Sequence, residues 1–286
     1  MEAPGGPRSA PGAASTRTVE IEGCRFRVRE HPGPRPGRDI VLLPPLGEGA
    51  LGWTRLVPAI RDAGRVLVVE AAGGAPALDR WERAALAAAE ENPAPELVLV
   101  GASTGGIVAI SAARRAPGRV RSVLALALRP DLVSLAPLAD LLAVRDLAGV
   151  RRLLGLSWAR PPEPGEAALS RLLGILSSED LQRLVREVAG RDVAAEIRAA
   201  RGAGTRVSFL AGARDGLLAA CLGAGASLEP DEDLTVLPDC AHYPQQENPQ
   251  ECARWILSRL ASSSPGSRER PVEPLLATKT SEEPRT

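Results

Sequence analysis

The sequence has almost no lysine. Lys279 is the only one among 35 Lys and Arg residues, which balance 35 Asp and Glu residues to a formal net charge of zero. Because positive charge is not in excess, the composition indicates no electrostatic surface for nucleic acid or for an anionic membrane. The preference for arginine, together with many Ala, Gly and Pro residues, is typical of a GC-rich genome, and we draw no function from it.

Aromatic residues, paired cysteines and long apolar runs are also scarce. Aromatic residues make up only 2% of the chain, so we expect a mainly aliphatic pocket. Cys24, Cys221, Cys240 and Cys252 form no Cys-x-x-Cys pair and have no histidine at zinc spacing, which predicts reduced, buried side chains and no metal or organic cofactor. No stretch reaches membrane-spanning length and no secretory signal is evident. We therefore expect a soluble, cytoplasmic protein without a nucleic-acid or membrane partner.

The most informative stretch is residues 96–110. It begins as an apolar run of strand length, breaks at Gly101-Ala102-Ser103-Thr104-Gly105, and continues as an Ala, Ile and Val segment of helical length. A serine between two glycines at a strand–turn–helix junction is the nucleophile-elbow pattern, which projects the hydroxyl above the sheet. The alternative is a tight turn in which Ser103 only caps the helix.

Short apolar runs alternate with helical segments through most of the chain, which predicts a parallel sheet with right-handed crossovers. Two alternating stretches on either side of Gly23 predict an antiparallel pair ahead of this sheet. Besides the strand before Ser103 and the helix after it, the expected strands are 16–22, 24–29, 39–43, 65–69, 120–128, 205–210 and 234–237, and the expected helices are near 53–62, 78–91 and 249–260.

The alternation stops between residues 129 and 200, where the pattern is helical except for a Pro-rich interruption at 159–165. We interpret this segment as a cap inserted over the sheet. The expected organisation is a flexible leader over 1–15, a core formed by 16–128 and 201–260, the cap over 129–200, and a disordered tail over 261–286.

A serine nucleophile needs a base to activate it, and the chain has only two histidines. His31 lies in a Pro- and Gly-rich loop ahead of the parallel sheet and is most simply a solvated residue. His242 follows the last predicted strand, at the carboxyl-end side where the active sites of such sheets lie. His242 is therefore the expected base, with a loop-capping role as the alternative.

The expected acid is Asp215, which follows the strand 205–210 in an Asp-Gly turn. An ordinary turn of this kind is the alternative. Asp131, just beyond the strand 120–128, is the reserve candidate. Asp239 lies three residues before His242 and is expected to stabilise its own loop.

The chain order Ser103, Asp215, His242 resembles the α/β-hydrolase superfamily over most of residues 16–260. Supporting matches are the Pro117-Gly118-Arg119-Val120 turn, Gly212-x-x-Asp215, and Glu247-Asn248-Pro249 ahead of the final helix. The resemblance implies a mostly parallel sheet flanked by helices, with a helical cap that shapes substrate choice.

The resemblance also implies an oxyanion hole built from two backbone N–H groups, those of Leu46 and Thr104. The sequence departs from the family here, because Pro44-Pro45 stands where many relatives carry His-Gly, and proline has no N–H to donate. Glu48 lies close to this loop, and we expect it to be a solvated turn residue.

These features predict a serine hydrolase that cleaves a carboxylic ester or thioester of a small to medium, mainly apolar acyl group through an acyl-enzyme. The same triad supports acyl transfer, carbon–carbon bond hydrolysis or a lyase step, since the fold does not determine the reaction. A non-catalytic binding protein with this fold is the third possibility, motivated by Pro44-Pro45. The expected partner is a small-molecule acyl substrate.

Overall fold

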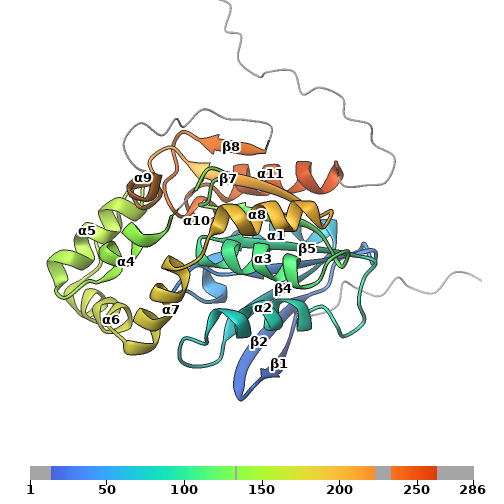
Figure 1. The fold of residues 1–286 in the computed structure, drawn as a ribbon, viewed down its shortest axis with the longest axis horizontal. Coiled ribbons are helices and arrows are strands. Elements are labelled where there is room, and N and C mark those ends of the chain that lie inside the picture. The colour runs from blue at the N-terminus through green and yellow to red at the C-terminus, as the bar shows by residue number, and fades with distance from the viewer. Residues whose placement is uncertain (1–13, 133, 223–232, 263–286) are drawn as a thin grey trace, which may run out of the picture.

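A mostly parallel sheet lies at the centre of the molecule (Figure 1). The computed structural model describes residues 14–132, 134–222 and 233–262. Within these ranges the sheet has eight strands in the order β1-β2-β4-β3-β5-β6-β7-β8. β1 and β2 pair antiparallel at one edge, as predicted, and β3 to β8 run parallel to one another. The strands are β1 (Ser15–Ile21), β2 (Cys24–His31), β3 (Arg38–Leu43), β4 (Arg65–Ala71), β5 (Glu96–Ala102), β6 (Val120–Leu126), β7 (Arg206–Gly212) and β8 (Leu234–Leu237).

Helices cover both faces of the sheet. On one face, α2 (Leu78–Ala87), α3 (Thr104–Arg115) and α8 (Val193–Gly202) pack side by side and share one apolar core with the strands. On the other face, α1 (Val57–Ile60) packs against α11 (Pro249–Ala261) over a second core that contains Trp53 and Trp255. The nearly continuous burial of the parallel strands follows from this double cover.

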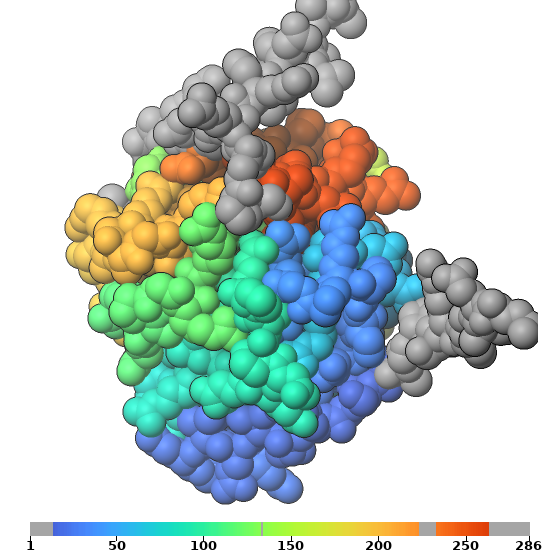
Figure 2. Space-filling view, turned by 90° about the vertical axis from the view of Figure 1, so that its right-hand side faces the viewer, coloured from blue at the N-terminus to red at the C-terminus, as the bar shows by residue number. Residues whose placement is uncertain are grey.

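Four helices between β6 and β7 stand to one side of the sheet, at the left of Figure 1. They are α4 (Ala136–Leu142), α5 (Leu147–Ser157), α6 (Glu166–Leu176) and α7 (Glu179–Ala189), and we call them the cap helices. They enclose a small apolar cluster around Val144, Val150 and Leu169. Figure 2 shows the molecule from the end that lies away from the cap helices. In this view the N-terminal strands lie at one edge and the C-terminal helix lies at the other.

Three details differ from the predictions. The segment 129–200 predicted as the cap includes most of α8, which packs on the sheet beside α3 instead. The helix expected near 53–62 is broken into η1 (Ala50–Trp53), α1 and η2 (Arg61–Ala63), since Pro58 lies in the first turn of α1 and its missing N–H prevents a continuous helix through that point. Two short helices, α9 (Gly216–Leu222) and α10 (Pro244–Glu247), were not predicted.

The expected leader falls mostly, and the expected tail almost wholly, outside the described residues, which begin at 14 and end at 262. Across the described part of the chain, no helix combines the length and the apolar character needed to cross a membrane.

Candidate active site

Ser103 lies at the sharp turn between β5 and α3. Its backbone has φ 52° and ψ −120°, a strained conformation for a residue with a side chain. The flanking glycines make the turn possible. A Cβ on Gly101 would lie 2.1 Å from the Gly105 carbonyl oxygen, and a Cβ on Gly105 would lie 2.2 Å from the Leu43 carbonyl oxygen. The turn therefore has the geometry of a nucleophile elbow.

The structure brings Ser103, His242 and Asp215 together although they are far apart in the sequence. The Ser103 hydroxyl lies 2.9 Å from His242 Nε2, and His242 Nδ1 lies 2.7 Å from Asp215 Oδ2. All three side chains are buried. Burial lowers the pKa of His242, but the charge and hydrogen bond of Asp215, with the charges of Glu48 and Glu247, outweigh it and raise that pKa above its ordinary value.

Asp215 follows the end of β7 and begins a turn into α9. Its Oδ1 accepts a hydrogen bond from the Leu218 N–H at 2.9 Å, which leaves Oδ2 for His242. Gly212 allows the histidine loop to come this close, because a Cβ on Gly212 would lie 2.3 Å from the Ala241 carbonyl oxygen.

A carboxylate holds the histidine loop in place. Glu247 Oε1 accepts hydrogen bonds from the N–H groups of Ala241 at 2.9 Å and Tyr243 at 3.2 Å. Its Oε2 accepts from the Ala159 N–H at 2.8 Å, just beyond α5 of the cap. Glu247 thus connects the loop that carries His242 to the cap helices.

Two further contacts join the same segments. The His242 N–H donates to the Ser157 carbonyl at 2.9 Å, and the rings of Trp158 and Tyr243 stack with their centroids 4.8 Å apart. The end of α5 and the histidine loop therefore form one packed unit.

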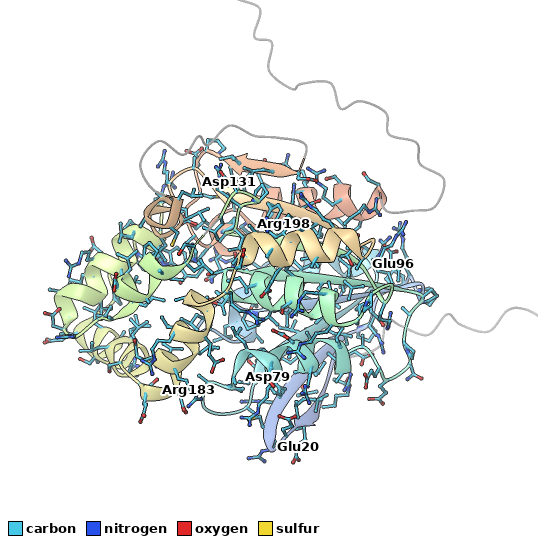
Figure 3. All side chains as sticks on the ribbon, viewed as in Figure 1. Glu20, Asp79, Glu96, Asp131, Arg183 and Arg198 are labelled. Carbon is cyan, nitrogen blue, oxygen red and sulfur yellow. The ribbon has the colours of Figure 1, made fainter. Side chains whose placement is uncertain are left out.

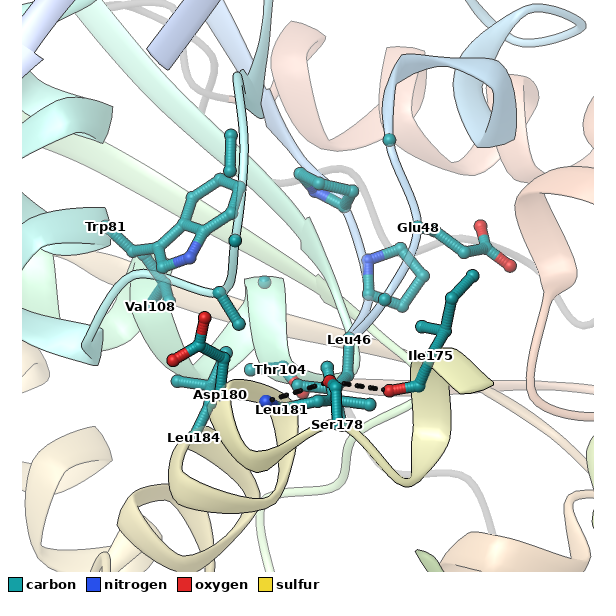
Figure 4. A pocket seen from close by; sticks show the side chains of 18 of the residues that line it. Leu46, Glu48, Trp81, Thr104, Val108, Ile175, Ser178, Asp180, Leu181 and Leu184 are labelled. Carbon is teal, nitrogen blue, oxygen red and sulfur yellow. Dashed lines mark hydrogen bonds between the residues drawn. The ribbon is translucent and has the colours of Figure 1, made fainter. Parts of the chain in front are cut away.

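The backbone N–H groups predicted for an oxyanion hole belong to residues that line one large cavity. Leu46 and Thr104 both face it (Figure 4). Pro44 and Pro45 are buried in its wall, and the Glu48 N–H donates to the Pro45 carbonyl at 3.2 Å, which closes a turn around Leu46. Thr104 is the first residue of α3, where the helix dipole favours negative charge.

The expectation that Glu48 is a solvated turn residue is wrong. Its side chain lines the same cavity, and Oε2 accepts a hydrogen bond from Gln246 Nε2 at 2.9 Å. Burial raises the pKa of Glu48 to about 7, although the hydrogen bond from Gln246 and the charge of His242 act in the opposite direction. Gln246, far along the chain, is the hydrogen-bond partner of this carboxylate.

Two cavities of very different size both border Thr104, the residue that follows Ser103, and Ser103 itself lines the narrow one. The large one has a volume of about 890 Å³ and extends between the Leu46 loop, Trp81 and the cap helices α6 and α7. The narrow one has a volume of about 10 Å³ and is lined by Ser103, His242 and apolar side chains from the loop after β6, from the start of α4 and from α9. Among the described residues that line them, only Thr104 borders both cavities.

The other candidates lie apart from this cluster. Asp131, labelled in Figure 3, forms a two-pronged ion pair with Arg129 at 2.7 and 2.8 Å, which lowers the pKa of Asp131. Asp239 pairs with Arg214 at the exposed surface. His31 is the last residue of β2 rather than a loop residue, and partial burial with nearby arginines lowers its pKa.

All four cysteines are free. Cys240 and Cys252 are buried as expected, whereas Cys24 and Cys221 are half-buried. Among the described residues, no group of three or more His, Cys, Asp or Glu side chains has a metal-binding arrangement.

Comparison with known proteins identifies the family. Residues 40–255 match the model of the alpha/beta hydrolase family. The chain belongs to this family. The alpha/beta hydrolase is 29% identical over 260 residues to a pimeloyl-[acyl-carrier protein] methyl ester esterase of Methylococcus capsulatus, a match that covers 79% of this chain and 96% of the relative. It is 38% identical over 102 residues to a probable esterase PIR7A of Oryza sativa subsp. indica, which covers 32% of this chain and 39% of that protein.

Solved structures share the fold of this alpha/beta hydrolase. Carboxylesterase CesB from Bacillus subtilis superimposes with a TM-score of 0.61 at 14% identity, covering 88% of this chain and 93% of that one. Epoxide hydrolase A from Mycobacterium thermoresistibile gives a TM-score of 0.57 at 21% identity, covering 87% and 98%. Membership of this family makes the chain a hydrolase and confirms the predicted superfamily, and the shared fold confirms the predicted fold class.

Proposed function

We propose that this alpha/beta hydrolase cleaves carboxylic esters through an acyl-enzyme on Ser103. The observation that carries the proposal is the continuous relay from Ser103 Oγ to His242 Nε2 and from His242 Nδ1 to Asp215, on an elbow with strained backbone. The names of the relatives support an ester as the substrate, since both are esterases. Thioesters stay within the proposed substrate range.

In the proposed mechanism, the Ser103 hydroxyl gives its proton to His242 Nε2 while Oγ attacks the ester carbonyl carbon. Asp215 accepts the hydrogen bond from Nδ1–H, which fixes the tautomer and stabilises the imidazolium. The carbonyl oxygen becomes an oxyanion beside the N–H groups of Leu46 and Thr104, a stabilisation that is worth about 3 to 4 kcal/mol per donor in related chemistry. The alcohol leaves with the proton from His242, and water then releases the acid by the same steps.

Hydrolysis of methyl esters of increasing acyl length, followed by the release of acid, tests the proposal. The wild type is expected to release acid from these esters, and Ser103→Ala is expected to release none above the uncatalysed rate. A fluorophosphonate probe is expected to label the wild type at Ser103 and to leave Ser103→Ala unlabelled. Equal hydrolysis rates in both proteins, or no labelling of the wild type, would show that the elbow is only structural.

A further inference from the structure

The two cavities that border Thr104 differ so much in size that they limit both the acyl group and the alcohol of an ester. We propose that the substrates are esters of a very small alcohol, such as methanol or ethanol, with a much larger acyl group. The narrow cavity sets the limit on the alcohol. This inference rests on the proposed ester hydrolysis at Ser103 and adds which arm of the substrate lies on which side.

The narrow cavity has no more than about the volume that one water molecule needs. Its volume of about 10 Å³ compares with the roughly 10–15 Å³ that one water molecule needs by the same measure. Its walls are buried leucines from three separate segments, so widening it requires those segments to move apart against close packing. The wall residues are Leu128, Leu135, Leu138, Leu217, Leu218 and Cys221.

The chemistry of this cavity suits an alkyl group. Burial raises the pKa of the Cys221 thiol to about 11, so the thiol is uncharged at neutral pH and adds an apolar wall and no competing nucleophile. Apart from Ser103, Thr104 and His242, the lining residues offer no polar side chain other than this thiol.

The position of His242 decides which arm enters the narrow cavity. During acylation the bond from Ser103 Oγ to the carbonyl carbon forms, the bond from that carbon to the alcohol oxygen breaks, and the proton taken from Ser103 passes from Nε2 to the leaving alcohol. The leaving oxygen must therefore lie within hydrogen-bond reach of Nε2. Among the described lining residues, His242 borders the narrow cavity and not the large one. The alcohol consequently occupies the narrow side.

The acyl group then extends into the large cavity. Its volume of about 890 Å³ lies in the range of cavities that enclose whole small-molecule ligands. Val108, Leu181 and Leu184 give it an apolar surface for a long chain (Figure 4). Thr104, at the border of the two cavities, carries one of the N–H groups proposed to face the carbonyl oxygen.

Three isomeric esters test the assignment at equal size and nearly equal hydrophobicity: methyl heptanoate, butyl butanoate and hexyl acetate. We expect kcat/KM for methyl heptanoate to exceed that for each of the other two by at least about tenfold, the discrimination that a tight apolar pocket gives per added methylene. If hexyl acetate is hydrolysed as fast as methyl heptanoate, the narrow cavity holds the acyl group and not the alcohol. Butyl butanoate hydrolysed as fast would show that the narrow cavity sets no limit. Either result overturns the inference.

A matched pair of variants locates the limit. Leu217 lines the narrow cavity and Leu184 the large one, and each is 4% exposed. Leu217→Ala is expected to raise kcat/KM for butyl butanoate relative to methyl butanoate by about tenfold. Leu184→Ala is expected to keep that ratio, because both esters carry the same acyl group. Leu217→Val makes the same test with a smaller loss of packing. Folded Leu217 variants that keep the wild-type ratio would overturn the inference.

Labelling separates the two proposals. If the fluorophosphonate labels Ser103 but the order of the three esters is not the expected one, the proposed hydrolysis stands and the assignment of the arms is wrong. If Ser103 is not labelled and no ester is cleaved, the proposed function itself is wrong.

Discussion

Glu48 makes the stability of this protein depend on pH. Its pKa rises from the ordinary value of 4.5 to about 7 in the folded state, mainly because burial disfavours the charge. Between these pH values the folded state keeps a proton that the unfolded state has released, so the free energy of unfolding falls as the pH rises through this window. At about 1.4 kcal/mol per pH unit, the loss reaches about 3 kcal/mol above pH 7.

Glu48→Gln removes this titration and keeps a carbonyl oxygen that can accept the hydrogen bond from Gln246. We expect the variant to gain up to about 3 kcal/mol over the wild type near pH 8.5 and much less near pH 5. Urea unfolding followed by tryptophan fluorescence at both pH values measures the difference. Glu251→Gln is the control, since the Glu251 carboxylate pairs with Arg254 at the surface. Parallel stability–pH curves for the wild type and Glu48→Gln would refute the reasoning.

Two further variants test how the site is held together. Glu247→Gln turns an amide group toward N–H groups that the carboxylate now satisfies, so we expect the free energy of unfolding to fall by about 1 to 3 kcal/mol and kcat to fall more than KM changes. Urea unfolding and steady-state kinetics measure both, and an unchanged kcat would show that this carboxylate does not position His242. Gly105→Ala places a Cβ 2.2 Å from the Leu43 carbonyl oxygen, and we expect the free energy of unfolding to fall by at least about 3 kcal/mol. We also expect this variant to lose fluorophosphonate labelling at Ser103. Gly155→Ala, where a Cβ meets nothing within 4 Å, is its control in thermal unfolding, and an equally small effect of both alanines would contradict the steric argument.

The parts of the site that the sequence predicts are those set by local chain geometry. Ser103 between two glycines specifies a turn at a strand–helix junction, and the carboxyl ends of parallel strands meet at one edge of the sheet. Asp215 and His242 each follow such a strand, so their positions along the chain were enough to predict that they approach each other. Asp131 also follows a strand, but the neighbouring Arg129 pairs with it, and only the structure separates the two aspartates.

The parts that the sequence does not predict depend on contacts between distant segments. Glu48 has the sequence environment of a turn, and its hydrogen-bond partner Gln246 lies 198 residues further along the chain. The sequence places Glu247 in the segment before the final helix and gives no sign of its role in the site. Its contact with Ala159 depends on where the cap helices return to the sheet. The narrow cavity likewise joins leucines from the loop after β6, from the start of α4 and from α9, and α9 was not predicted.

The double proline is compatible with an oxyanion hole for a reason that the packing makes clear. The carbonyl oxygens of Leu43 and Pro44 lie close to the elbow, since a Cβ on Gly105 would strike both of them. Carbonyls are the groups that proline retains, and its fixed φ holds the loop in that approach without glycine. The N–H needed for an oxyanion belongs to the next residue, Leu46, which borders the large cavity. Replacement of His-Gly by Pro44-Pro45 therefore removes two backbone N–H groups that the proposed mechanism does not use. It also stiffens the segment that presents the Leu46 N–H, which the mechanism does use.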